Sequence, residues 1–216
     1  MNAGDVPNVL RTPVATSRPP FDKVTIAFHW ATVLLVFAMF ATAWLHTYAH
    51  NGALRASLLL IHRSLGTTIW VGTVVRLAWR LTNAKLPPFP TKTTKIHRAF
   101  VQASEYSLYG LLLSLPATGL ASTLFRGRQF ALLFWQFPIL LPEDNALHAV
   151  FHWAHQIGAW ALGILVAVHS VAALVHHFLL RDDVLQCMAP VLKAKQHKRE
   201  FWPRNIMRRP SFAKES

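Results

Sequence analysis

Four histidines lie within or at the edge of long apolar stretches of this 216-residue chain: His29, His62, His155 and His169. Hydrocarbon penalises an imidazole that has no partner, so each of these side chains needs one, and such intramembrane groups are usually functional. His155 and His169 are 14 residues apart within one apolar stretch. On a helix this spacing separates two rings by roughly 21 Å in depth and returns the second to within about 40° of the first. Both rings therefore face the same side.

The elements that must position these rings are membrane-spanning helices. Runs of about 20 apolar residues cross about 30 Å of hydrocarbon, and 53% of this chain is hydrophobic while only 14% is charged. The sequence predicts an all-α integral membrane four-helix bundle with spans at 24–47, 58–81, 104–124 and 153–180. Residues 1–20 are expected to form a disordered arm without a cleavable signal peptide, residues 21–190 the membrane domain and residues 191–216 a basic tail.

The net charge of +13 follows the predicted topology. Four spans put both termini on one side, and that side carries 18 of the 22 Lys and Arg residues. The positive-inside rule then predicts that both termini are cytoplasmic. This uneven distribution of Lys and Arg across the membrane accounts for the basic net charge, so no nucleic-acid partner is expected. The opposite side keeps four arginines: Arg55, Arg63, Arg126 and Arg128.

This topology pairs the histidines by depth: His62 with His155 near the outer face, and His29 with His169 near the cytoplasmic face. A neutral imidazole ligates a metal through one nitrogen while the other donates an orienting hydrogen bond. The pattern therefore predicts two haems, each held by two axial imidazoles with no open position on the iron. Cys187 is the lone cysteine, which excludes covalent C-x-x-C-H attachment, so the haems would be b-type. The alternative is a set of interhelical hydrogen-bonding histidines.

Arginines near each face are candidates for binding anions. Arg63, Arg126 and Arg128 are predicted to form a positive outer mouth that attracts an anion toward the outer haem. Arg76 and Arg80 lie near the cytoplasmic end of the second span, where they either snorkel to the interface or bind haem propionates.

Several other polar residues have weaker assignments. His176, seven residues beyond His169, is a candidate donor to a quinone carbonyl or a propionate, and otherwise an interfacial anchor. Glu105 lies in a predicted span; an interfacial position is favoured over pairing with a loop cation or a proton path. Solvation at the interface is favoured over a metal site for three histidines that share a helix face: His148, His152 and His155.

Residues 130–141 form an apolar stretch in the outer loop that ends before Pro142 and is too short to span a membrane. An interfacial or re-entrant cap is expected there. Within the third span, Pro116 predicts a kink.

Five stretches of the chain resemble the bacterial cytochrome b561 family, and together they cover about residues 21–190. They are Phe28-His29-Trp30, Ile61-His62-Arg63-Ser64-Leu65-Gly66, Arg76-Leu77-Ala78-Trp79-Arg80, Leu115-Pro116-Ala117-Thr118-Gly119, and the run from His155 through His169 to His176-His177. The resemblance implies a four-helix membrane cytochrome with two b haems. By position, it makes His29, His62, His155 and His169 the axial ligands and links His176 with a quinone site. Many relatives have a histidine four residues before the tyrosine of the third helix, whereas this chain has Glu105 before Tyr109.

The best-understood members of that family resemble superoxide oxidases, which take electrons from periplasmic superoxide and pass them to ubiquinone. The leading hypothesis is thus a superoxide:quinone oxidoreductase in the bacterial inner membrane, with lipid, superoxide and quinone as partners. The alternative is a membrane-anchoring cytochrome b relay subunit of a hydrogenase or dehydrogenase complex, whose redox partner docks on residues 130–141. A third hypothesis is a colourless bundle whose histidines carry protons.

Overall fold

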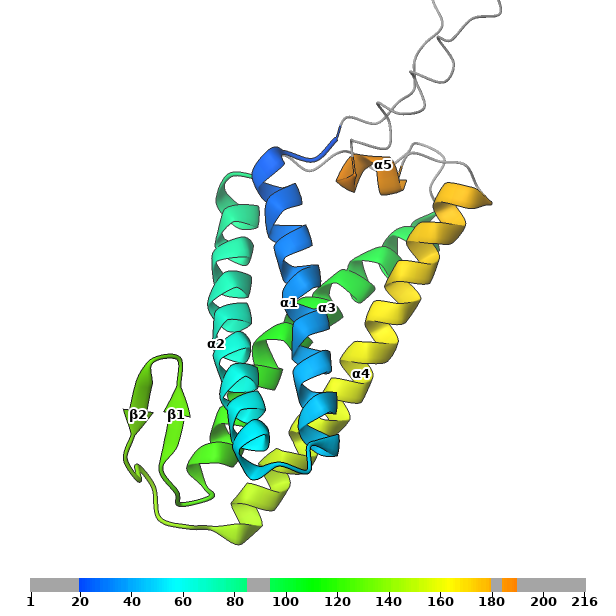
Figure 1. Cartoon of the computed structure of the whole chain (residues 1–216). Coiled ribbons are helices and arrows are strands. Elements are labelled where there is room, and N and C mark those ends of the chain that lie inside the picture. Colours follow the sequence, from blue (N-terminus) through cyan, green and yellow to red (C-terminus); the bar gives the residue numbers. More distant parts are fainter. Residues whose placement is uncertain (1–19, 85–93, 180–183, 190–216) are drawn as a thin grey trace, which may run out of the picture.

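The structure is a computed structural model, and it describes residues 20–84, 94–179 and 184–189. It consists mainly of four long helices: α1 (Lys23–Tyr48), α2 (Gly52–Thr82), α3 (Lys95–Leu124) and α4 (Asn145–Phe178) (Figure 1). All four are long and apolar enough to cross a membrane. The predicted all-α four-span fold is therefore confirmed. The predicted tail and, apart from Pro20, the predicted arm lie outside the described residues.

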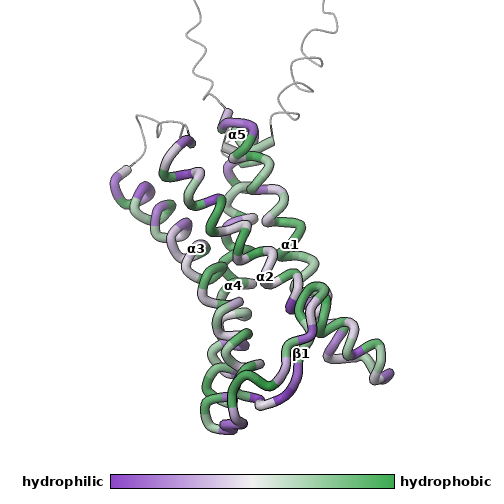
Figure 2. The backbone as a smooth tube through the Cα atoms, turned by 90° about the vertical axis from the view of Figure 1, so that its left-hand side faces the viewer, coloured by the Kyte–Doolittle hydropathy of each residue, from purple (hydrophilic) through white to green (hydrophobic). Residues whose placement is uncertain are grey.

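Three of the helices begin earlier than their apolar runs indicate. The predicted spans start at 58, 104 and 153, but α2, α3 and α4 start at Gly52, Lys95 and Asn145, so the loops before them are shorter than expected. Each early start has a polar N-cap whose side-chain oxygen accepts a backbone N–H of the first turn: Asn51, Thr94 and Asp144. These caps extend the helices into the headgroup region, where an apolar sequence is not required. Figure 2 shows apolar residues concentrated along the helices between their ends.

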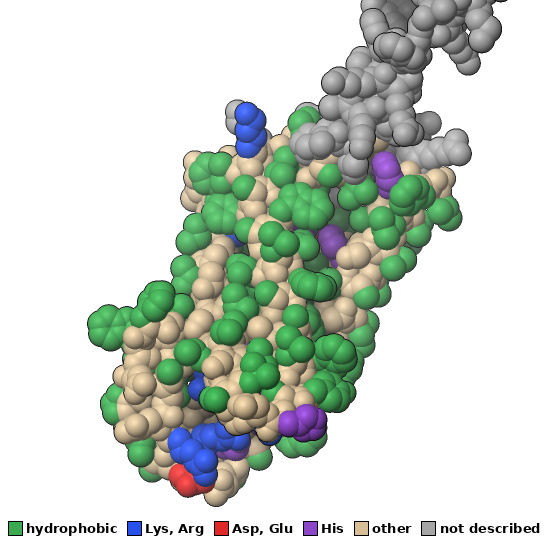
Figure 3. All heavy atoms as spheres, viewed as in Figure 1, with side chains coloured by type: hydrophobic (Ala, Val, Ile, Leu, Met, Phe, Trp, Pro, Cys, Tyr) green, Lys and Arg blue, Asp and Glu red, His purple; other side chains and the backbone are tan. Residues whose placement is uncertain are grey.

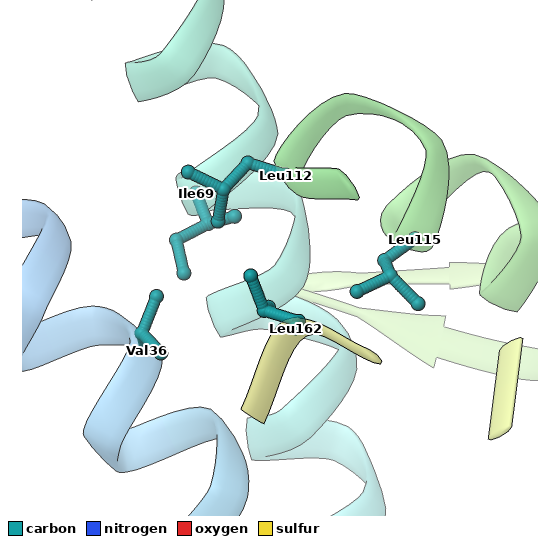
Figure 4. Packing of buried hydrophobic residues seen from close by; sticks show 5 residues of the cluster. All are labelled: Val36, Ile69, Leu112, Leu115 and Leu162. Carbon is teal, nitrogen blue, oxygen red and sulfur yellow. The ribbon is translucent and has the colours of Figure 1, made fainter. Parts of the chain in front are cut away.

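Long helices that follow one another in the chain pack against each other. α1 packs on α2, α3 on α4, and α2 on α3. Small residues let these helices approach, with Gly66 against Met39 and Gly158 against Leu115. A small apolar cluster joins all four helices at mid-height (Figure 4); it contains Val36, Ile69, Leu112, Leu115 and Leu162. Pro116 lies inside α3, which continues unbroken to Leu124.

Most large apolar side chains point outward, as lipid allows. Leu34, Phe37 and Trp160 on α1 and α4 are each at least 70% exposed. Figure 3 shows such side chains over most of the visible face of the bundle. Lipid tails are as apolar as these residues, so the surface belongs against hydrocarbon.

The two ends of the described chain meet at one end of the bundle. The short helix α5 (Val184–Met188) lies beside the start of α1 (Figure 1). The N–H of Phe21 donates to the carbonyl of Cys187 at 3.2 Å, and the Trp30 indole donates to the carbonyl of Met188 at 2.9 Å. Because the number of spans is even, the two ends must lie on the same side of the membrane. That this end is cytoplasmic remains a prediction.

The outer apolar stretch forms a β-hairpin, an element that the sequence analysis did not anticipate. β1 (Phe130–Leu132) pairs antiparallel with β2 (Trp135–Phe137) across a two-residue turn. Leu133 in the turn has a positive φ of 54°. The hairpin contacts α2 and lies beside its outer half (Figure 1).

Candidate functional site

Two of the four predicted imidazoles meet near the end of the bundle away from α5, which the sequence predicts to be the outer end. His62 of α2 and His155 of α4 are half-buried, and their ring centres are 6.2 Å apart. An imidazole nitrogen binds a transition metal at about 2 Å and lies roughly 1.2 Å from its ring centre, so two rings on opposite sides of one metal have centres about 6.3 Å apart. The observed separation therefore fits one metal between two axial imidazoles.

Backbone carbonyls of the other two helices hold these rings. His155 Nδ1 donates to the carbonyl of Leu115 on α3 at 2.9 Å. His62 Nδ1 lies 3.3 Å from the carbonyl of Met39 on α1, to which it donates. Because a carbonyl only accepts, both rings carry their proton on Nδ1, and Nε2 keeps the lone pair that binds metal.

Gly119 on α3 makes room for the His155 ring. A Cβ at this position would lie 3.1 Å from both Cε1 and Nδ1 of His155, closer than side chains normally pack. Any larger residue would therefore press on the ring and on its hydrogen bond to Leu115. The Leu115–Gly119 stretch thus supplies both the acceptor and the space.

The second pair lies nearer the end that carries α5. The ring centres of His29 on α1 and His169 on α4 are 6.4 Å apart, which again fits one metal between two imidazoles. Arg76 of α2 is close enough to interact electrostatically with both rings, and its guanidinium lies 3.4 Å from the Thr32 hydroxyl. The His169 ring is exposed in the described structure, and Figure 3 shows a hollow between α1 and α4 with a histidine side chain in it.

A charged cluster lies between α2 and α3 close to this second pair. Arg80 forms a two-pronged ion pair with Glu105, in which one of the two N–O distances is 2.8 Å. The guanidinium groups of Arg76 and Arg80 lie 5.4 and 5.9 Å from the centre of the Tyr109 ring. From the sequence, an interfacial Glu105 is favoured; in the structure, its carboxylate pairs with a residue of a neighbouring helix. With Arg80 already paired, Arg76 is the freer candidate for a propionate.

The outer arginines are only partly brought together. Arg63 lies over the Phe130 ring at 5.9 Å and is close enough to Arg126 for their charges to interact. Arg126 and Arg128 are both exposed, and they flank Gly127, whose φ of +64° makes the tight turn after α3. Figure 3 shows basic side chains gathered at the end of the bundle where α1 joins α2. The described contacts do not place Arg128 beside the other two.

The remaining histidines lie in two places. The ring of His176 lies 5.5 Å from that of His97 on α3, a neighbour that the sequence analysis missed because 97 fell outside the predicted span. His148 Nδ1 donates to the carbonyl of Ser122 at 2.8 Å, and its ring centre is 5.9 Å from that of His152. His155 faces His62 instead, and the described residues contain no group of three metal-ligating side chains.

The fold and the two imidazole pairs define a class of protein: a helical membrane protein in which histidines of different spans face each other at separations that suit a metal ion. Comparison with known proteins gives the family. Residues 20–190 match the family model described as prokaryotic cytochrome b561, and the chain belongs to this family. It is therefore a membrane-spanning b-type cytochrome of electron transport, as the resemblance indicated.

Curated relatives agree with this assignment. Cytochrome b561 homolog 2 of Escherichia coli (strain K12) is 28% identical over 170 residues, which cover 78% of this chain and 90% of that protein. Cytochrome b561 homolog 1 of the same organism is 27% identical over 176 residues, which cover 79% of this chain and 97% of that protein. A Yersinia pestis protein named probable superoxide oxidase CybB is 27% identical over 176 residues, covering 79% and 96%.

Proposed function

We propose that the chain is a two-haem superoxide oxidase: it takes single electrons from superoxide outside the membrane and delivers them to ubiquinone. The observation that carries this proposal is that four histidines form two facing pairs: the ring centres are 6.2 Å apart in one pair and 6.4 Å apart in the other. Their α4 members are separated by 14 residues, roughly 21 Å of helix. Two iron centres at these levels would divide the hydrocarbon thickness into short electron-transfer steps.

His62 and His155 would hold the outer haem, and His29 and His169 the inner one. The donor set fits, because each pair offers two imidazoles whose separation would suit one iron between them. When bound, haem b supplies one-electron chemistry at its iron. The protein supplies the orientation of the ligand rings and a positive charge, Arg76, for the acidic propionates near the inner pair.

At the outer face, the task of the residues is to attract a small anion. Arg63 and Arg126 concentrate positive charge on the side of the outer pair that is nearest to solvent, and the exposed Arg128 adds to that charge. Superoxide loses one electron to become O₂ and needs no proton. Two superoxide anions therefore give two O₂ and the two electrons that reduce one quinone.

At the other face, the task is to bind quinone and supply protons. Reduction of ubiquinone to quinol takes two electrons and two protons. His176 and His97, with rings 5.5 Å apart beyond the inner pair, can donate to a quinone carbonyl and exchange protons with solvent. The orientation with both termini in the cytoplasm, and location in the inner membrane, belong to the same proposal; the excess of Lys and Arg on that side supports it.

The test uses the purified holoprotein in detergent. A pulse of superoxide should reduce the haems, seen as growth of the reduced b-type absorption bands within milliseconds to seconds, and added ubiquinone should reoxidise them. Superoxide dismutase added beforehand is the control and should abolish the reduction. Haems that stay oxidised under the pulse would overturn the superoxide assignment, although the protein would remain a b-type cytochrome.

A further inference from the structure

The β-hairpin is fixed to α2 by two contacts and is held together by an aromatic stack of its own. The N–H of Leu133 donates to the Ser64 hydroxyl at 2.9 Å. Arg63 lies over Phe130, which is only 8% exposed, and Phe130 stacks on Phe137 with ring centres 5.2 Å apart. The base of the hairpin is thus packed and its turn is tethered, so the position of the turn relative to α2 is defined.

The tip of this hairpin, Leu133–Trp135, exposes large apolar side chains. Phe134 is 98% exposed and Trp135 is 71% exposed. Exposing such a side chain to water costs about 1.5–3 kcal/mol relative to burial. Gln136, the neighbouring polar residue, lies on the opposite face of the strand from Trp135. The apolar and polar residues are therefore separated as they would be at a boundary between lipid and water.

The level of the tip along α2 lies within the outer leaflet. Ser64, which the tip contacts, is six residues inside the apolar run that begins at 58, or roughly 9 Å along the helix axis. The turn also points back along α2, toward the end of the bundle that carries α5 (Figure 1). Ile61 and Trp70 of α2, three and six residues from Ser64 in the chain, are 46% and 44% exposed.

We propose that the hairpin tip is a membrane anchor, inserted among the acyl chains of the outer leaflet. Large apolar side chains such as Phe134 and Trp135 are favoured there over water. The occupant is lipid because the helix that the tip contacts is itself long and apolar enough to cross the membrane, and the contact lies within its apolar run. Strands of three residues leave few open backbone groups, and the N–H of Leu133 already donates to Ser64, which lowers the cost of placing the turn in lipid. The anchor holds the chain that carries Arg126 and Arg128 against the bundle.

The test places a fluorescent probe at the tip. Cys187 is the lone cysteine, so Phe134→Cys in a Cys187→Ala background carries one environment-sensitive label. The holoprotein is reconstituted into phosphatidylcholine–phosphatidylglycerol vesicles that contain nitroxide lipids, labelled either near the headgroup or near the end of the acyl chain. We expect the lipid nitroxides to quench this label at least twofold more strongly than a label at the polar Gln136, and we expect the label to be protected from aqueous iodide.

Two matched positions calibrate this measurement. Gln136→Cys, on the polar face of the same hairpin, should be quenched by iodide and little by either lipid. Val71→Cys, 52% exposed and near the middle of the α2 span, should be quenched most by the deep nitroxide. Trp135→Cys gives a second measurement at the tip. If both tip labels behave like Gln136→Cys, the anchor is refuted and the surface is free for a soluble partner. Haem absorbance confirms folding, and superoxide plays no part, so this result stands apart from the proposed function.

Discussion

Gly119→Ala tests the orientation of the outer ligand with a single methyl group. The added Cβ would lie 3.1 Å from Cε1 and Nδ1 of His155, where ordinary contacts begin near 3.4 Å, so the ring must shift by a few tenths of an ångström. The ring cannot shift freely, because Nδ1 is held by Leu115 at 2.9 Å. The added methyl group should therefore weaken either this hydrogen bond or the bond from His155 to iron, because the displaced ring cannot keep both in place.

The size of the effect follows from the weaker of these two bonds. Losing a hydrogen bond and leaving its carbonyl buried costs about 1–3 kcal/mol, which corresponds to a roughly 5- to 150-fold loss of affinity. Removal of an outer-shell partner of a metal ligand typically costs about 10- to 100-fold, in the same range. We therefore expect the haem between His62 and His155 to be lost in part on purification, or retained with an altered potential.

The assay is haem content per chain by the pyridine haemochrome method, with low-spin electron paramagnetic resonance signals and a redox titration of the same sample. Gly110→Ala is the matched control, because a Cβ at this position on the same helix meets nothing within 4 Å. It should leave both haems unchanged and should stabilise α3 by about 0.5–1 kcal/mol.

The comparison between the two alanine variants shows whether the His155 ring lies against Gly119. If Gly119→Ala keeps the haem content, low-spin signals and potentials of Gly110→Ala, then the His155 ring does not lie against Gly119 in the holoprotein. The assignment of Leu115 as its hydrogen-bond acceptor would then fail as well.

Three further substitutions test other parts of the site. His29→Ala and His155→Ala should each remove one haem rather than two, measured as haem per chain, because the pairs share no ligand; loss of both from either variant contradicts the pairing. Glu105→Gln leaves Arg80 without its carboxylate and makes the surroundings of the inner pair more positive by one charge, so the midpoint potential of that haem should rise by on the order of tens of millivolts. The double variant Arg80→Gln/Glu105→Gln should restore the original potential. Asp22 has a pKa held below its ordinary 3.8, chiefly by a side-chain hydrogen bond within the first turn of α1, so it contributes stability above pH 4 that is lost as pH falls through the lowered value. Asp22→Ala should therefore cost about 1 kcal/mol near neutral pH, and a melting difference that persists at pH 2 would argue against this cap.

The levels at which the histidines lie could be predicted from the sequence. The number of spans followed from apolar length, and the direction of each span then put His62 with His155 and His29 with His169. The structure brings these rings within 6.2 and 6.4 Å of each other. Depth along a helix is a one-dimensional property, and so the order of residues is enough to determine it.

Contacts that depend on the rotation of one helix against another could not be predicted in this way. The ion pair of Arg80 with Glu105 joins residues 25 positions apart on different helices, and its geometry depends on how α2 faces α3. The meeting of His97 with His176 was missed because α3 begins at a polar cap, well before its apolar run. The hairpin was missed because three-residue strands leave too short an alternating pattern to recognise.

The outer pair shows why no short motif encodes this site. Its imidazoles come from α2 and α4, but the carbonyls that orient them belong to Met39 on α1 and Leu115 on α3. Each helix thus contributes either a ring or the acceptor for a ring on another helix, and every acceptor is a backbone atom that any residue type could supply. The rings can be recognised in the sequence because they are histidines. The backbone acceptors cannot, and the one indirect sign of them is Gly119, which leaves space for the His155 ring. The ligands are therefore oriented only when all four helices are packed together, which makes assembly of the bundle a condition for tight binding at this level.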